Sequence, residues 1–154
     1  MKVERLFIGR PSDGLLIEQD QVTVVAGAGI EGDRYFGRHE EPGQNITLIE
    51  AEEIEALLGA SGRPVDLSIT RRNLVTRGVR LNEFVGREFK VGDVLLRGVE
   101  LCDPCLGLGA ALASPGLSAA EVVKRFMQRA GLRADLVSGG VIARGAVVQS
   151  AAQR

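Results

Sequence analysis

The stretch VELCDPCLGLG, residues 99–109, holds both cysteines of the chain and closes a region rich in β-type sequence. Val99 and Leu101 predict the end of a strand, because β-branched and large apolar residues favour extended backbone. Pro104 lacks a backbone N–H and cannot continue a ladder, and two glycines follow Cys105. We therefore expect Cys102 and Cys105 to lie at the rim of a sheet, outside the core.

Strand-like segments lie on both sides of this corner. Residues 86–97 predict two strands around a tight turn at Gly92-Asp93, and the second continues through Gly98 to the cysteines. After the corner, two apolar runs within residues 132–149 are divided by Gly139-Gly140 and predict a closing hairpin. Further strands are expected over residues 3–8, 15–17, 21–26 and 46–49, and around Leu74 and Val75.

Two segments have the 3.6-residue apolar period of a helix. Residues 50–58 carry one apolar stripe, with Gly59 as a residue that ends the helix. The second helix begins with a capping box, Ser118 to Glu121, and ends before Gly131. Its predicted core-facing stripe consists of Val122, Val123, Phe126, Met127 and Ala130.

These segments predict a single domain over residues 1–154 of the mainly β, α+β class. About seven to eight short strands and two helices follow one another without regular alternation, which argues against βαβ repeats. We expect a closed or nearly closed mixed β-barrel with the two helices packed against it.

Composition excludes several classes of partner. The formal net charge of −1 offers no field for nucleic acid, and no run approaches the ~18 apolar residues of a membrane span. The N-terminal residues lack the apolar core of a signal peptide, and two cysteines are too few for a disulfide scaffold. We therefore expect a cytoplasmic protein with reduced thiols.

Residues 27–32, GAGIEG, match the Gly-x-Gly-x-x-Gly pattern of dinucleotide-binding folds. That pattern needs an amphipathic helix directly behind it, and residues 33–45 contain two glycines, a proline and no apolar period. The segment is instead predicted to be a long polar loop, and loops of that length in compact domains are usually functional or mobile.

Of the 19 basic residues only three are lysines, so 16 are arginines, whose planar donor fork matches carboxylate or phosphate. Three polar elements lie at predicted strand ends or loop mouths: Asp33-Arg34, Gln44-Asn45 and Arg71-Arg72-Asn73. If the fold gathers them with the cysteine corner at one rim, they form an anion pocket with a thiolate in its wall.

The Cys-x-x-Cys leaves three interpretations open. A redox dithiol fits Pro104 but lacks a βαβ setting, and a structural zinc site lacks ligands, since only His39 could join the two cysteines. The third is a single working thiolate that ligates a soft metal or carries sulfur, favoured by nearby arginines and backbone N–H groups.

An ordered series of motifs resembles the MOSC domain, the C-terminal domain of molybdenum cofactor sulfurases, which also occurs as small stand-alone bacterial proteins. The series is GIEGDR (29–34), QNITLI (44–49), RNLVTRG (72–78), VGD (91–93) and CDPC (102–105), and the resemblance covers nearly the whole chain.

The resemblance implies a β-barrel that binds the molybdenum–pterin cofactor, Mo-molybdopterin, or handles sulfur destined for a metal. It makes Cys105 the metal ligand or sulfur carrier, with Cys102 as the alternative. It assigns Asp33, Arg34, Arg72 and Asn73 to the cofactor phosphate and the pocket. Asn45, in QNITLI, and Arg71, which directly precedes RNLVTRG, are also expected to bind the cofactor. A thiolate suits molybdenum, and arginine suits a phosphate.

Two departures from the family pattern matter. The pyridoxal-phosphate domain of the sulfurases is absent, and no lysine stands in a Schiff-base context, so pyridoxal phosphate belongs to the family association alone. The family often has histidine after Gly-Asp-Arg, where this chain has Tyr35.

Three functions remain as expectations. An oxidoreductase would reduce N-hydroxylated substrates at a Cys105-ligated molybdenum, with electrons from a separate donor protein. A non-catalytic carrier would hold a persulfide supplied by a cysteine desulfurase, or would deliver the cofactor. A degenerate barrel would merely bind an anion.

Overall fold

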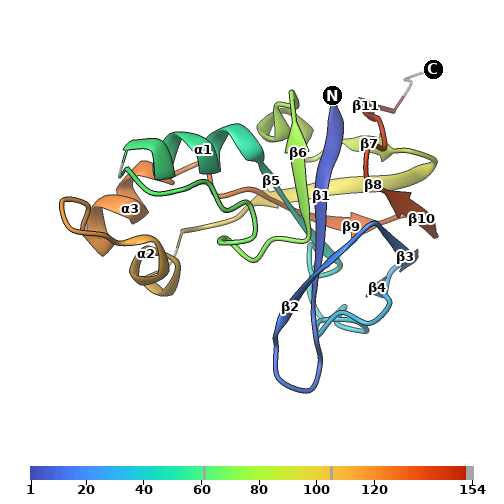
Figure 1. The fold of residues 1–154 in the computed structure, drawn as a ribbon. Coiled ribbons are helices and arrows are strands. Elements are labelled where there is room, and N and C mark those ends of the chain that lie inside the picture. The colour runs from blue at the N-terminus through green and yellow to red at the C-terminus, as the bar shows by residue number, and fades with distance from the viewer. Residues whose placement is uncertain (61, 105, 152–154) are drawn as a thin grey trace.

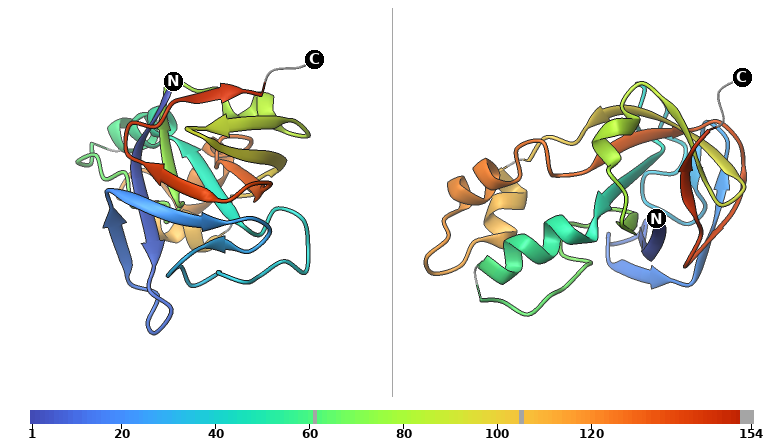
Figure 2. Two further views of the ribbon diagram at one scale, coloured as in Figure 1. Left: turned by 90° about the vertical axis from the view of Figure 1, so that its right-hand side faces the viewer. Right: turned by 90° about the horizontal axis from the view of Figure 1, so that it is seen from above.

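The computed structural model describes residues 1–60, 62–104 and 106–151. Strands form the larger part of the molecule, and the α-helices gather at one end of it (Figure 1). The view from above shows the same division, with the helices at one end and the strands at the other (Figure 2).

Eight strands of the described chain form one mixed sheet. Their bounds are β1 Lys2–Gly9, β2 Leu16–Gln19, β5 Ile46–Glu50, β6 Leu74–Arg77, β7 Glu88–Val91, β8 Val94–Leu101, β9 Leu132–Leu136 and β11 Val148–Ser150. The order across the sheet is β11-β7-β8-β9-β5-β6-β1-β2, and only β5 and β6 run parallel to each other.

A second, smaller sheet packs against the large one. It consists of β3 Gln21–Val25, β4 Gly29–Ile30 and β10 Gly140–Ala143, in the order β10-β3-β4. Buried residues of both sheets, including Val22, Val24, Ile30 and Ile142 from the small one, form a single apolar cluster. This cluster is the core between the two sheets.

The central strands are buried on both faces. Leu6 of β1, Leu48 of β5 and Leu74 of β6 point into the cluster between the sheets. Their neighbours Phe7, Ile49 and Val75 point the other way, into a second cluster beneath the helices. Successive side chains of a strand alternate between faces, so the continuous apolar runs of these strands serve two cores.

Three α-helices in the described ranges cover this second face: α1 Ala51–Ala60, α2 Leu106–Leu112 and α3 Ala119–Arg125. A short 3-10 helix, η1, spans Leu81–Phe84. Helix α1 links the parallel strands β5 and β6 as a crossover. Ser118 caps α3 by accepting the Glu121 N–H at 3.2 Å, which confirms the predicted capping box. None of these helices has the length and apolar character needed to span a membrane.

The predicted mainly β class with a mixed sheet is confirmed. The large sheet is not closed, so the word barrel describes the fold only loosely. The described chain has eleven strands and three α-helices, more than predicted. The additional helix is α2, whose segment LGLGAAL contains two glycines that weaken the sequence signal for a helix.

Three local predictions are wrong. Gly59 does not end the first helix, because α1 continues to Ala60 and Gly59 keeps a negative φ. The last strands form no hairpin: β9 pairs with β5 and β8, β10 pairs with β3, and β11 pairs with β7. Met127 belongs to no core stripe, because α3 ends at Arg125 and the Met127 side chain is 58% exposed. The left-handed φ of Gln128, +63°, ends the helical periodicity there.

Candidate functional site

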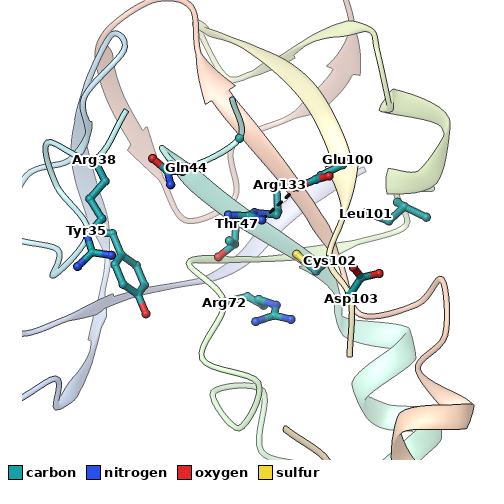
Figure 3. A pocket seen from close by; sticks show the side chains of 11 residues that line it. Tyr35, Arg38, Gln44, Thr47, Arg72, Glu100, Leu101, Cys102, Asp103 and Arg133 are labelled. Atoms are coloured by element: carbon teal, nitrogen blue, oxygen red, sulfur yellow. Dashed lines mark hydrogen bonds and ion pairs between the residues drawn. The ribbon is translucent and has the colours of Figure 1, made fainter. Parts of the chain in front are cut away.

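The cysteine corner borders a pocket of about 410 Å³, which we call the cysteine pocket (Figure 3). Its wall combines the polar loop after β4, the start of β5, the segment before β6, the end of β8 and one residue of β9. The lining residues are Tyr35, Arg38, Gly43, Gln44, Thr47, Arg72, Glu100, Leu101, Cys102, Asp103 and Arg133.

A second pocket of about 270 Å³, which we call the arginine pocket, adjoins the first and shares Tyr35, Thr47 and Arg72 with it. It is lined by Arg34, Tyr35, Thr47, Ile69, Thr70, Arg71, Arg72, Asn73, Gly107, Leu108 and Ala111. Among the described residues, three guanidinium groups and no carboxylate line it, and one of these groups, that of Arg34, lies 3.9 Å from the buried Asp33 carboxylate.

Cys102 lies in the core beneath the helices, with 6% of its surface exposed. This corrects the prediction for Cys102, which was expected on a rim outside the core; Cys105, the other residue of that prediction, lies outside the described residues. Helices α2 and α3 cover it, and its backbone N–H donates to the Gly131 carbonyl at 2.8 Å. Burial raises the pKa of the Cys102 thiol above its ordinary range. Cys102 is therefore a neutral thiol at neutral pH.

Two arginines place positive charge beside this thiol. Arg72 and Arg133 both act to lower the pKa of Cys102, against the larger effect of burial, while Glu100 and Asp103 act to raise it. Arg133 pairs with Glu100 at 3.1 Å across strands β9 and β8 (Figure 3). Arg72 donates from Nε to the Ala130 carbonyl at 3.1 Å, and no carboxylate is paired with it within the described residues.

Tyr35 forms the wall between the two pockets. Its ring lies 4.5 Å from the guanidinium carbon of Arg34 and 5.3 Å from that of Arg38, within the range of cation–π attraction. The side chain is 44% exposed. A tyrosine is therefore at the pocket where the family pattern often has histidine, and its aromatic face is held by two cations.

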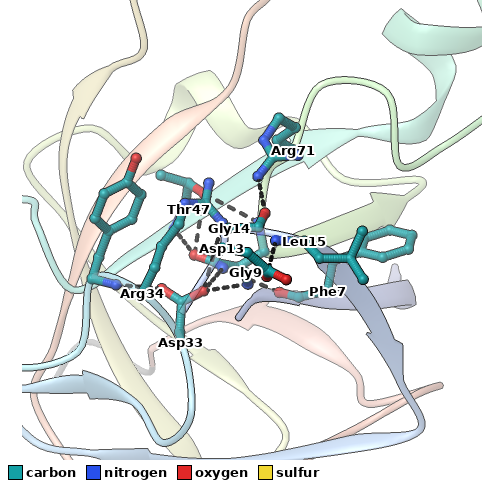
Figure 4. Close-up of polar contacts among 11 residues, drawn as sticks. Phe7, Gly9, Asp13, Gly14, Leu15, Asp33, Arg34, Thr47 and Arg71 are labelled. Atoms are coloured by element: carbon teal, nitrogen blue, oxygen red, sulfur yellow. Dashed lines mark hydrogen bonds and ion pairs between the residues drawn. The ribbon is translucent and has the colours of Figure 1, made fainter. Parts of the chain in front are cut away.

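Asp33 (Figure 4) and Asn73 form hydrogen bonds with backbone groups around the pockets. Asp33 accepts the Gly9 N–H at 2.8 Å and the Tyr35 N–H at 3.2 Å, and Asn73 lies 3.5 Å from the same carboxylate. Asn73 also donates to the Phe7 carbonyl at 3.1 Å and accepts the Thr47 N–H at 3.1 Å. These buried groups join β1, β5 and β6 and the loop after β4.

Asn45 and Arg71 are likewise engaged with backbone. Asn45 is buried and accepts the Leu136 N–H at 3.0 Å. Arg71 is exposed, has a left-handed φ of +61°, and donates to the Gly14 carbonyl. Each of the three predicted polar elements contributes at least one residue to the lining of a pocket. Asp33 and Asn45, however, line neither pocket.

Cys105, the predicted metal ligand, lies outside the described residues. Its described neighbours in sequence reach both pockets: Asp103 lines the cysteine pocket, and Gly107 lines the arginine pocket. Within the described ranges no group of three or more His, Cys, Asp and Glu side chains is arranged to hold a metal ion.

Sequence reasoning missed Arg38, Thr47, Thr70 and Arg133 as pocket residues. Arg133 lies on β9, far from every motif, and reaches the site only because β9 pairs with β8. Thr70 directly precedes Arg71-Arg72-Asn73, so extending that motif by one polar residue would have included it. Thr47 lies within the motif QNITLI but was assigned only to a strand.

Comparison with solved structures supports the fold. The YUAD protein from Bacillus subtilis superimposes with a TM-score of 0.81 at 21% identity, over 98% of this chain and 96% of that chain. YiiM from Geobacillus stearothermophilus gives 0.71 at 18% identity, over 98% and 75% of the two chains. YiiM from Escherichia coli gives 0.66 at 15% identity, over 97% and 70%. Likeness at these identities shows the fold alone.

The sequence comparisons identify the family. No curated protein matches the chain. The family model of the MOSC domain, however, matches residues 36–149, which is more than half of the chain and includes β5, β8 and the cysteine corner, residues 99–109. This chain belongs to the MOSC domain family, which is known for molybdenum cofactor binding.

Proposed function

We propose that this protein binds the molybdenum–pterin cofactor in the cysteine pocket. The observation that carries the proposal is the pair of guanidinium groups, Arg72 and Arg133, that place positive charge beside the sulfur of Cys102. An anionic cofactor gains electrostatic stabilisation from this charge, and arginine adds directed hydrogen bonds.

The donor groups of the pocket fit a cofactor that brings its own metal ligands. The described residues offer one thiol, three arginines and two carboxylates, one of which is already paired with Arg133. A cation bound directly by protein needs three or four converging ligands, which the described residues do not provide. A soft metal carried by a pterin needs from the protein a sulfur ligand and partners for its polar groups.

The roles of the two cysteines differ in this proposal. Cys105 is the thiolate ligand of the metal. Cys102, buried and neutral, lines the pocket and is not a metal ligand. Arg72, exposed to both pockets and unpaired with any described carboxylate, is the principal contact for the anionic cofactor.

The bound cofactor would supply two-electron chemistry at an oxygen atom, and we propose reduction of N-hydroxylated substrates as the reaction. The N–O bond breaks, two electrons arrive from a separate donor protein, two protons are taken up, and an amine and water leave. Gln44 and the phenol of Tyr35 provide hydrogen-bonding groups for such a polar substrate at the pocket wall.

The test is molybdenum content by elemental analysis, in protein made in a host that produces the cofactor. Wild type is expected to carry close to one molybdenum per chain, Cys105→Ser to lose it, and Cys102→Ser, as the matched control, to retain most of it. Circular dichroism and thermal unfolding establish that each variant is folded.

Negligible metal in both wild type and Cys105→Ser would contradict the proposal. Intact mass would then decide on the carrier function, because a persulfide adds the mass of one sulfur atom to wild type and not to Cys105→Ser. Equal metal in wild type and Cys105→Ser, with loss in Cys102→Ser, would move the ligand to Cys102.

A further inference from the structure

The loop after β4, residues 33–45, is fixed at both ends and exposed between them. Asp33 and Asn45 are 3% and 5% exposed, and both bond the backbone of neighbouring strands. Every residue from 35 to 42 is exposed. A segment with few buried contacts opens at lower free energy than the elements that anchor it, so motion of this loop is confined to its middle.

Two hydrogen bonds hold that middle part against the strands. The Gly37 N–H donates to the carbonyl of Ala28, in the turn between β3 and β4, at 2.9 Å. The Gly43 N–H donates to Oδ1 of Asp135, on β9, at 2.8 Å. Within the described part of the chain, residues 36–43 make no other hydrogen bond to a segment outside the loop.

A glycine stands at each of these two points, and the backbone is left-handed at both. The φ angles are +89° at Gly37 and +87° at Gly43. A Cβ atom added at Gly43 would lie 3.3 Å from the Cβ atoms of Val99 and Arg133, so this end of the segment is packed directly on β8 and β9. At Gly37 nothing lies within 4 Å of an added Cβ, which leaves the backbone room to turn.

The same segment forms one wall of the cysteine pocket. Arg38, Gly43 and Gln44 line the pocket, and Tyr35 and Arg38 lie on the side away from Cys102 (Figure 3). Displacement of the segment therefore removes this wall and widens the route from solvent to Cys102.

We propose that residues 37–43 are a lid of the cysteine pocket, which pivots at Gly37 and is latched by the hydrogen bond from Gly43 to Asp135. The structure holds the latched state. Opening breaks two hydrogen bonds and buries or exposes little apolar surface, because residues 38–42, RHEEP, are already exposed to water. The lid rests on the proposed function for the identity of the ligand that it admits.

Trypsin measures the opening, because the lid contains Arg38. We would follow the cut after Arg38 in cofactor-free protein, identified by the masses of the two fragments. When opening and closing are faster than cleavage, its rate follows the open fraction. Asp135→Ala, which removes the latch, is expected to raise the rate roughly five-fold. Asp135→Asn keeps the acceptor oxygen and should stay within about two-fold of wild type.

The pivot has a matched control elsewhere in the chain. Gly37→Ala strains the latched backbone and should also speed the cut after Arg38 several-fold. Gly116, in the connection between α2 and α3, has a φ of +91° and likewise nothing within 4 Å of an added Cβ. Gly116→Ala therefore introduces the same strain away from the pocket and should leave that cut within about two-fold.

Equal cleavage of wild type and Asp135→Ala would overturn the latch. Acceleration by Gly116→Ala equal to that by Gly37→Ala would overturn the pivot, because the strain would then act through the stability of the whole protein. Hydrogen exchange of residues 37–43 in the same variants should rise in parallel with cleavage, and unchanged exchange in Gly37→Ala would contradict the lid.

A second arm uses protein from a cofactor-producing host. Loaded wild type should be cut after Arg38 several-fold more slowly than cofactor-free protein, and Gly37→Ala should lose molybdenum on dialysis faster than Gly116→Ala. Equal cleavage of loaded and free protein, with close to one molybdenum per chain, would overturn the lid and leave the proposed function standing. If wild type never carries molybdenum, the proposed function fails, and the cofactor-free variants alone decide on the lid.

Discussion

Thr47 and Asn73, which both line the arginine pocket, are joined by reciprocal hydrogen bonds. The Thr47 hydroxyl accepts the Asn73 backbone N–H at 3.1 Å and donates to the Asn73 side-chain oxygen at 3.2 Å, which also accepts the Thr47 N–H at 3.1 Å. The pair connects the starts of the parallel strands β5 and β6.

Asn73→Ala is therefore expected to destabilise the protein by about 2–4 kcal/mol, because the Phe7 carbonyl and the Thr47 N–H lose their buried partners. Urea unfolding monitored by circular dichroism measures the change. Thr47→Ser, which keeps the hydroxyl, is the matched control and should cost about 1 kcal/mol or less. A loss below about 0.5 kcal/mol in Asn73→Ala would show that the network is dispensable.

The stability of the protein is expected to fall at alkaline pH through Cys102. Burial raises the pKa of its thiol above the ordinary value of 9.0, so the folded state keeps a proton that the unfolded state releases. The contribution is complete below about pH 9 and is lost as the pH rises through the folded-state pKa. Thermal unfolding of wild type and Cys102→Ala between pH 7 and pH 10.5 measures it, and the stability advantage of wild type should shrink above pH 9. An advantage independent of pH would contradict the raised pKa.

Close packing of α2 against α3 is expected to make Gly109 intolerant of substitution. A Cβ atom there would lie 2.6 Å from the Ala119 carbonyl oxygen and 3.1 Å from Cγ2 of Val123. Gly109→Ala should cost about 1–3 kcal/mol, because α2 must move from α3. Gly59→Ala, also in a helix but with nothing within 4 Å of the added atom, is the control and should add about 0.5–1 kcal/mol of stability. Similar effects of the two changes in guanidinium unfolding would disprove the close contact.

Tyr35 is expected to support the cofactor through its aromatic face. Its ring contacts the guanidinium groups of Arg34 and Arg38 and forms a wall of both pockets. Removing the ring therefore removes the cation–π contact of both arginines. Tyr35→Ala should lower the molybdenum content of protein made in a cofactor-producing host at least several-fold, while Tyr35→Phe, which keeps the ring, should retain most of it. Loss in Tyr35→Phe equal to that in Tyr35→Ala would assign the role to the phenol.

Much of the local structure was predictable, because it depends on neighbouring residues. The strands at the N-terminus, the first helix, the capping box of α3 and the loop after β4 follow from apolar periodicity, side-chain caps and turn residues. The motif series led to the MOSC family, and the family model confirms it over residues 36–149.

Helix α2 was not predictable, because its stability comes from outside its own segment. Two glycines in seven residues disfavour a helix, and one of them, Gly109, is in close contact with α3. The same packing reversed the expected exposure of Cys102. Sequence signals of a turn at Pro104 say nothing about which helices cover Cys102, two residues earlier.

The order of motifs along the chain by itself determined the fold class and the family, since periodicity and caps are properties of short segments. The tertiary structure decided which polar residues face a cavity. Asp33 and Asn45 turned inward to bond the backbone, whereas Arg133, with no motif around it, reached the pocket because β9 pairs with β8. Hydrogen bonds between strands that are distant in the sequence decide which polar side chains face the cavity. The free energy of these bonds depends on burial, which exists only once the sheet has formed.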